Sequence, residues 1–120
     1  MSPKDIVLEL YKSDVLLDKE AVEQLMHQEV TIEWNSSKGF IQMNYDDILA
    51  LTEELSRAYV RSKMRISHVV TEGNTVALRF SHFVKTIENP REEMLLAHFA
   101  IIWEVKDNKL YRGYQMSQFS

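Results

Sequence analysis

The chain lacks cysteine, and it contains only three glycines and two prolines among its 120 residues. Without cysteine, disulfides and thiol chemistry are excluded. Because glycine and proline are so sparse and no stretch is of low complexity, a flexible linker is not expected. A single core of this size buries roughly two thirds of the surface that the unfolded chain exposes. We therefore predict one domain over residues 1–120.

Concentrated positive charge is also missing, since the formal net charge is −4. Nucleic-acid binding requires a basic field, so we expect no nucleic-acid partner. The N-terminal apolar run contains Asp5 and Glu9, which a signal peptide or a membrane span would not carry. We expect a cytoplasmic protein that does not contact a membrane.

Metal-binding patterns are absent as well. The four histidines do not recur at the spacing of metal ligands, and neither His-x-His nor His-Glu-x-x-His occurs. We therefore expect neither a metal nor another cofactor.

What the sequence does contain begins with two helices. Ser2, Pro3 and Asp5 form a variant of the capping box at the first helix start. Asp18 is an N-cap candidate for a second helix, which is predicted to run through AVEQLMHQ, residues 21–28.

A strand and a third helix follow. Residues 29–34 alternate with a period of two, which is typical of a half-buried strand, and residues 35–40 have loop chemistry. Asn44, with Asp47 three positions later, opens the third helix. The apolar residues of this helix share one stripe and are Ile48, Leu51, Leu55, Ala58 and Tyr59.

The remainder of the chain reads as strands. Tight turns separate four runs, residues 63–70, 75–87, 92–105 and 109–119, and such runs form an antiparallel meander. We predict an α+β fold. Its strongly curved antiparallel sheet, made of the meander and the earlier strand, wraps around about three N-terminal helices to form a cone with an internal pocket.

Alternation along these strands assigns their faces. His82 falls on the apolar face of the run 75–87, so it is expected among the groups that pack on the helices. The run 92–105 is apolar on both faces, and soluble monomers rarely expose such a patch. We expect a homodimer that packs sheet on sheet, with its centre near Leu96, His98, Ala100 and Ile102.

Three stretches resemble the SnoaL-like branch of the nuclear-transport-factor-two-like superfamily, which has the cystatin-like fold. They are residues 10–34, 69–80 and 101–119. The superfamily's helix-one tyrosine, its helix-opening aspartate and its closing motif match Tyr11, Asp18, Trp103, Val105 and Lys109-Leu110. The resemblance implies the fold more than an activity, because this superfold hosts isomerases, cyclases, dehydratases, hydrolases and binding modules.

The resemblance also implies where an acid or base would lie. The acid of SnoaL-like cyclases corresponds to Gln118, which cannot exchange protons. The base of the similar ketosteroid isomerases corresponds to Trp34 or Asn35, and their second acid to about Ile101. The dehydratase type of site needs a His–Asp pair, of which His82 supplies only the first member. Each arrangement lacks a part.

Three functions therefore stay open. The first is binding of a small apolar ligand in a pocket lined by Tyr11, Trp34, Tyr59, Phe80, His82, Trp103, Tyr114 and Gln118. The second is an isomerase, cyclase or dehydratase that uses His82 with Tyr11, with Glu33 and Tyr114 as further titratable candidates. The third is a purely structural dimerisation module.

The last strand carries one further alternative. Leu110, Arg112, Tyr114, Met116 and Gln118 share a face if the strand is regular. A bulge at Gly113 would turn Gln115 and Ser117 inward instead.

Overall fold

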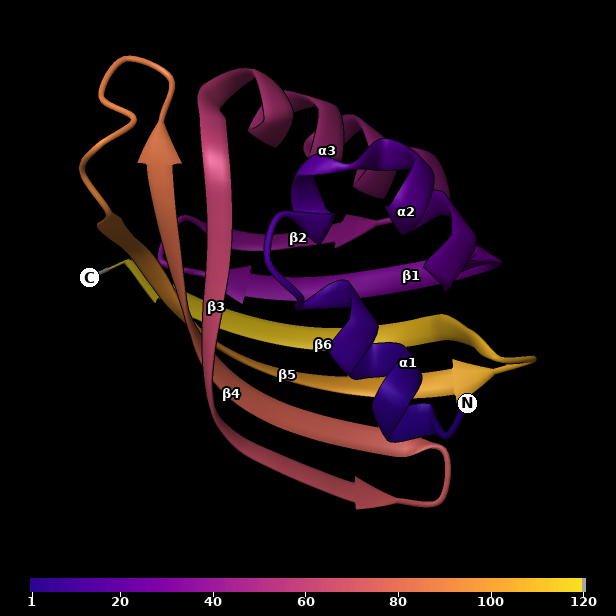
Figure 1. The fold of residues 1–120 in the computed structure, drawn as a ribbon. Helices are drawn as coiled ribbons and strands as arrows, with labels where there is room; N and C mark the ends of the chain where they lie inside the picture. Colours follow the sequence, from indigo (N-terminus) through magenta and orange to yellow (C-terminus); the bar gives the residue numbers. More distant parts are fainter. Residues whose placement is uncertain (120) are drawn as a thin grey trace.

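The computed structural model describes residues 1–119, which form an α+β fold (Figure 1). The helices are α1 (Pro3–Leu10), η1 (Val15–Leu17, a 3₁₀ turn), α2 (Lys19–Leu25) and α3 (Tyr45–Ala58). The strands are β1 (Met26–Ser36), β2 (Gly39–Met43), β3 (Tyr59–Glu72), β4 (Thr75–Thr86), β5 (Met94–Lys106) and β6 (Lys109–Phe119). Within the described chain, no helix has the length and apolar character needed to cross a membrane.

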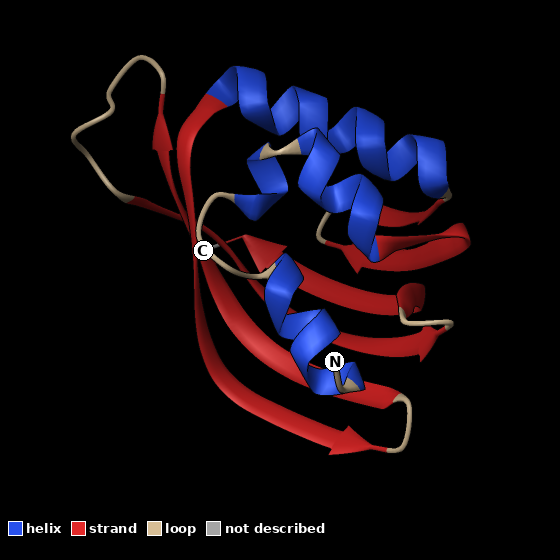
Figure 2. Cartoon of the chain, turned by 45° about the vertical axis from the view of Figure 1, so that its right-hand side comes forward, coloured by secondary structure: helices blue, strands red, loops and turns tan. Residues whose placement is uncertain are grey.

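All six strands of the described chain belong to one mixed sheet with the order β2-β1-β6-β5-β4-β3. The predicted meander of β3 to β6 is confirmed, and its strands are antiparallel. The early strand β1 lies parallel to the last strand β6, with Ile32 opposite Gly113. The sheet curls around the helices without closing, and the helices occupy its concave side (Figure 2).

The predicted helix starts are confirmed by their caps. The Ser2 hydroxyl accepts a hydrogen bond from the Asp5 amide at 3.2 Å. At α3, the Asp47 amide donates to Asn44 Oδ1 at 3.0 Å, and the Asn44 amide donates to Asp47 Oδ2 at 2.9 Å. These bonds satisfy amides that have no partner within the helix.

The end of the second helix was predicted wrongly, and one strand was missed. The second helix ends at Leu25 rather than at Gln28, because Met26 already pairs with Leu110 as the first residue of β1. Strand β2 was missed, since its five residues form a short edge strand that is exposed except at Met43, which hides the period-two signal.

Four bulges interrupt the meander. In β3, pairing passes from Tyr59 to Arg61 and from Ile66 to His68, which leaves Val60 and Ser67 as the extra residues. The extra residues in β5 and β6 are Leu96 and Tyr111. Each bulge exchanges the two faces of the strand beyond it, because side chains alternate with a period of two.

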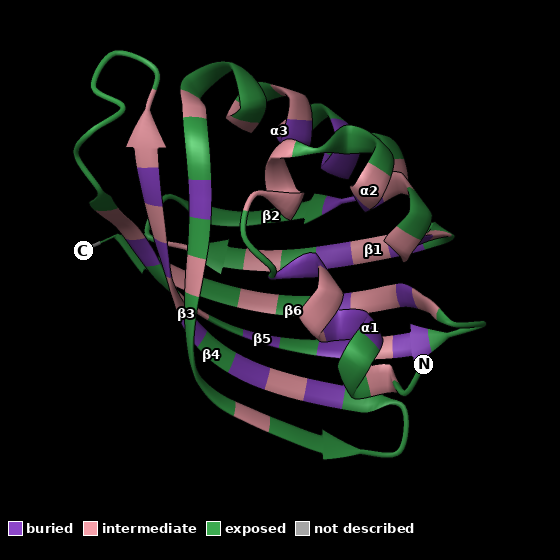
Figure 3. Cartoon of the chain, viewed as in Figure 1, coloured by how far each residue is buried: buried purple, intermediate pink, exposed green. Residues whose placement is uncertain are grey.

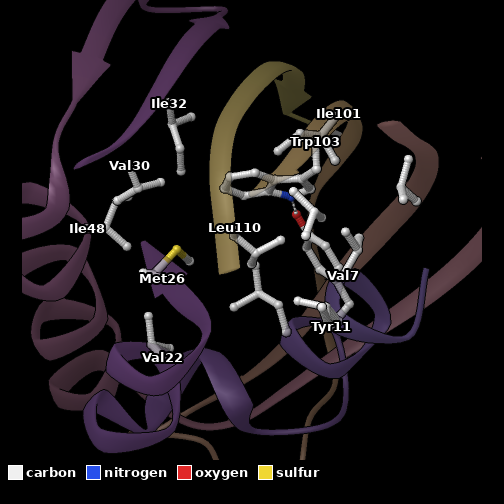
Figure 4. Close-up of a cluster of buried hydrophobic side chains, with 14 of the residues drawn as sticks. Val7, Tyr11, Val22, Met26, Val30, Ile32, Ile48, Ile101, Trp103 and Leu110 are labelled. Atoms are coloured by element: carbon white, nitrogen blue, oxygen red, sulfur yellow. Dashed lines mark hydrogen bonds between the residues drawn. The ribbon is translucent and has the colours of Figure 1, made fainter. Parts of the chain in front are cut away.

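The core lies between the helices and the concave face of the sheet. Buried and exposed positions alternate along β4 (Figure 3), and the inward set is the predicted one: Val76, Leu78, Phe80, His82 and Val84. The inward residues of β5 are also buried, most completely Ile101 and Trp103. Trp103 is the largest fully buried side chain and packs against α1 (Figure 4).

Candidate functional site

A cavity of about 120 Å³ remains between the helices and the concave face of the sheet. Its lining comes from α1, η1, α3 and all six strands, and it is mainly aliphatic and aromatic. The polar side chains at its wall are Tyr11, Thr52, His82 and Gln115. No Asp, Glu, Lys or Arg lines the cavity within residues 1–119. We call this space the central cavity.

His82 projects from β4 into the cavity wall and is held there by β3. Its Nε2 lies 2.7 Å from Ser62 Oγ, and both residues are buried. Ser62 is fixed in turn by Asp14, whose Oδ1 accepts a hydrogen bond from the Ser62 amide at 2.9 Å. Burial lowers the pKa of His82 from 6.5 to about 4, because the apolar surroundings disfavour the imidazolium.

The second ring nitrogen of His82, Nδ1, makes no hydrogen bond within the described chain. Every fully buried side-chain nitrogen and oxygen in the described chain has a hydrogen-bond partner, and the Ser62 contact involves only Nε2. Nδ1 is therefore not fully enclosed, and His82 is one of the residues that line the central cavity. The neutral ring offers a ligand one donor or one acceptor there, depending on which nitrogen carries the proton.

Tyr11 at the end of α1 closes another part of the wall. Its hydroxyl accepts a hydrogen bond from Trp103 Nε1 at 2.8 Å, drawn as a dashed line in Figure 4. Burial raises the pKa of the Tyr11 phenol well above its usual range, because a phenolate would be desolvated. Tyr11 therefore remains a neutral phenol, and its own hydrogen can still be donated.

Aromatic rings continue the wall from α1 across the sheet. Tyr11 packs on Phe80 with ring centroids 4.7 Å apart, and Phe80 stacks on Phe99 at 5.0 Å. Trp34 approaches Phe99 at 6.3 Å, and its Nε1 donates to Ser117 Oγ at 2.8 Å. Such a wall offers flat, apolar surface for another ring.

Five of the eight residues predicted for the pocket line the central cavity: Tyr11, Trp34, Phe80, His82 and Trp103. Tyr59, Tyr114 and Gln118 do not. Tyr59 is half-buried at the start of β3, opposite Thr86. Tyr114 and Gln118 lie on the convex face, because the bulge at Tyr111 exchanges the faces of β6. Of the two alternatives for this strand, the bulged one matches the structure, with the extra residue at Tyr111 rather than Gly113.

Other wall residues went unrecognised in the sequence. Thr52 lies on the apolar stripe of α3, four residues after Ile48, and its burial follows from that spacing. Ser62 holds His82 but does not itself line the cavity, and its place two residues before Met64 was a weak signal because β3 alternates poorly. Gln115 was placed inward only in the bulged alternative.

The convex face carries a separate shallow groove of about 520 Å³, which we call the convex groove. Exposed apolar side chains there are Val70, Ile102, Tyr114 and Met116. Glu33, one of the titratable candidates, also lines this groove and does not line the central cavity. Of the predicted dimer residues, Ala100 and Ile102 lie in the convex groove, and exposed His98 lies in a neighbouring one. Leu96 instead lines the central cavity, because it is the bulged residue of β5.

No titratable pair near neutral pH converges on the central cavity within the described chain. The position implied for the cyclase acid, Gln118, faces outward, and its inward neighbours in β6 are Gln115 and Ser117. Of the positions implied for isomerase carboxylates, Trp34 lines the cavity, Asn35 is exposed on the convex face and Ile101 is apolar core. The arrangement favours holding a neutral apolar group over moving a proton.

Comparisons with known proteins agree with this architecture. IdmH of Streptomyces antibioticus, a provisionally assigned polyketide cyclase, is 14% identical with a TM-score of 0.76, and the match covers 98% of this chain and 92% of IdmH. A protein of Catenulispora acidiphila with a ketosteroid isomerase-like fold, solved with trimethylamine, is 12% identical with a TM-score of 0.71. That match covers 96% of this chain and 85% of the other. An NTF2-like protein of unknown function from Cytophaga hutchinsonii is 15% identical with a TM-score of 0.68. That match covers 98% of this chain and 90% of the other. No curated protein matches the chain.

These likenesses establish the nuclear-transport-factor-two-like fold and leave the activity open. A family model gives the more specific result, because the SnoaL-like domain matches residues 11–113. That match spans most of the chain, from the end of α1 to the middle of β6. The chain belongs to the SnoaL-like domain family.

Proposed function

We propose that this protein binds a small, largely apolar molecule in the central cavity, with an aromatic ring as the best-fitting body. The observation that carries the proposal is the wall itself, which combines stacked aromatic rings with neutral polar groups and no charged side chain. Dry cavities of roughly 150 Å³ accept benzene in other proteins, and this cavity of about 120 Å³ is comparable. Thr52, His82 and Gln115 would orient one polar substituent.

Binding is favoured over acid–base catalysis because the two titratable wall groups are poorly tuned for proton transfer. A general base works best with a pKa near the working pH, whereas burial lowers the pKa of His82 to about 4. The raised pKa of Tyr11 makes it a weak proton donor. Catalysis of an isomerase, cyclase or dehydratase reaction by His82 and Tyr11 is therefore the second candidate function, after ligand binding.

Filling the cavity should abolish binding. Leu16 and Leu17 are neighbours in η1 and are both half-buried, but only Leu16 lines the central cavity. We expect Leu16→Trp to weaken benzene binding about tenfold or more, because the indole occupies the ligand's space. Amide and methyl NMR shifts during a benzene titration of the wild type and the variant measure this.

Leu17→Trp is the matched control, and it should bind benzene like the wild type. Thermal unfolding of both variants verifies that each remains folded. If benzene causes no saturable NMR shift in the wild type, the cavity is only a packing gap. That result would favour the alternative of a purely structural dimerisation module. If both variants lose affinity equally, the ligand does not lie beside Leu16.

We further propose that the protein is a homodimer that packs through the convex groove. Val70, Ile102 and Met116 are 66%, 45% and 62% exposed there, and soluble monomers rarely leave such residues contiguous. Glu33 and Arg79 both line the groove. In a two-fold symmetric dimer, the same patch of both subunits forms the interface. A patch that carries both a negative and a positive side chain can therefore place the negative one of each subunit against the positive one of the other.

A charge in this groove should separate the subunits. Ile102→Glu is expected to convert a dimer of twice 14.1 kDa into a monomer, because the carboxylate would be buried without a partner. Sedimentation velocity at micromolar concentration gives the mass. Val60→Glu, an exposed apolar residue of β3 outside the groove, is the control and should leave the dimer intact. A wild-type monomer under these conditions would contradict the proposal.

A further inference from the structure

A second hollow adjoins the central cavity. It measures about 270 Å³ and is formed by β1, β2, β5 and β6 near the end of the chain. Trp34, Leu96 and Phe99 line both this hollow and the central cavity, so only these side chains lie between the two spaces there. We call the second hollow the outer groove. A molecule too long for the cavity would extend past Trp34 into it.

The outer groove differs from the cavity in carrying one charge. Lys38, in the turn between β1 and β2, is the only Asp, Glu, Lys or Arg that lines it within residues 1–119. Its Nζ lies 5.5 Å from the ring centroid of Phe119, which also lines the groove, so the cation is directed over the groove. None of the ion pairs between residues of the described chain involves Lys38.

A rival rim of opposite charge borders the cavity at α3. It also includes Trp34 and carries Asp47 and Glu54. Asp47 already accepts the Asn44 amide in the α3 capping box, which engages one of its oxygens. Its approach to the cavity is also the shallower one, since this rim is lined by partly exposed residues of β2 and α3. Lys38 is thus the charge better placed for the polar end of a bound molecule.

We infer that the central cavity and the outer groove form one bipartite site for an elongated amphipathic acid. The aromatic or aliphatic body occupies the cavity, the chain passes Trp34, Leu96 and Phe99, and a carboxylate ends beside Lys38. This inference rests on the proposed binding function and specifies its ligand class. Neutral polar groups in the cavity and a single cation at the outer end match a molecule with one anionic terminus.

Three probes with one body test the charge preference. 4-Phenylbutyrate, 4-phenylbutanamide and 4-phenylbutylamine share a phenyl ring and chain, and differ in the charge of their ends. We expect the acid to bind about threefold to fivefold tighter than the amide at low salt, since exposed ion pairs contribute little more than this. The difference should shrink at high salt, because counter-ions screen exposed charges. Calorimetric titration gives the three dissociation constants.

Lys38→Gln should reduce the affinity for the acid to that for the amide, while leaving the amide unchanged, and Lys38→Arg should retain the preference. Lys4→Gln, which removes an exposed lysine of α1 remote from the groove, is the matched control. If the acid and amide bind equally in the wild type, the bipartite site is wrong but the cavity proposal stands. Tighter binding of the amine would assign the polar end to the acidic rim. If no probe binds, the proposed function fails as well.

Discussion

Replacing Gly113 by alanine should destabilise the fold by about 2 kcal/mol, although alanine normally favours a strand by up to about 1 kcal/mol. The added Cβ would lie 2.9 Å from Cζ3 of Trp103 and 3.2 Å from Cγ1 of Ile32. Carbon atoms in contact prefer about 3.5–4.0 Å. Trp103 is 1% exposed and hydrogen-bonded to Tyr11, so its ring cannot move away from the new methyl group. The steric clash therefore outweighs the preference of a strand for alanine over glycine. Urea unfolding followed by circular dichroism measures the change.

A double-mutant cycle identifies the cause. Trp103→Phe removes the benzo ring of the indole, to which Cζ3 and Cη2 belong, and therefore the main clash with a residue at position 113. In that background, Gly113→Ala should be neutral or slightly stabilising, so that the two substitutions are strongly non-additive. Additive effects of the two substitutions would show that Gly113 is required by the backbone of β6 and not by the close approach of Trp103.

Lowering the pH should destabilise the protein through His82. Its pKa is about 4 in the folded protein and about 6.5 when unfolded, so the unfolded chain binds more protons between these values. Stability therefore rises with pH across this window, and it is lost as the pH falls through it. Because one pKa unit corresponds to about 1.4 kcal/mol, we expect about 2 kcal/mol to be lost between pH 7 and pH 5. Urea unfolding at a series of pH values gives the slope.

His82→Gln isolates this contribution from that of the carboxylates, which also titrate in acid. The variant can still hydrogen-bond Ser62, and its stability should depend less on pH between about 4 and 6.5. His98→Gln removes an exposed histidine whose Nδ1 bonds Ser81, and it serves as the control for the loss of any imidazole. Identical pH slopes for the wild type and His82→Gln would contradict a buried neutral histidine.

The absence of an acid in the site does not depend on the register of the last strand. In a regular β6 the inward residues would include Tyr114 and Gln118, and in the observed bulged strand they are Gln115 and Ser117. Neither pair offers a carboxylate. The lack of a carboxylate on the last strand was therefore visible in the sequence alone, even though the inward face of the strand was not.

Local chemistry made much of the fold predictable. The caps at Ser2, Asp18 and Asn44 are bonds between neighbours in sequence, so residue types at short spacing reveal them. The turns between strands are equally local, and they defined the meander. Period-two alternation placed His82 correctly among apolar residues, because no bulge intervenes in β4.

Long-range pairing decided the rest. The parallel pairing of β1 with β6 and the fit of Gly113 against Trp103 join residues far apart in the chain, and no local pattern encodes them. The extra residues Leu96 and Tyr111 arise where a strand adapts to the curl of the sheet, and each one reverses the faces beyond it. The sequence by itself thus determined most of the elements, their order along the chain and the lack of a carboxylate on the last strand. Only the tertiary structure decided which side chains enclose the cavity, because a one-residue slip in pairing exchanges the inside and the outside of a strand.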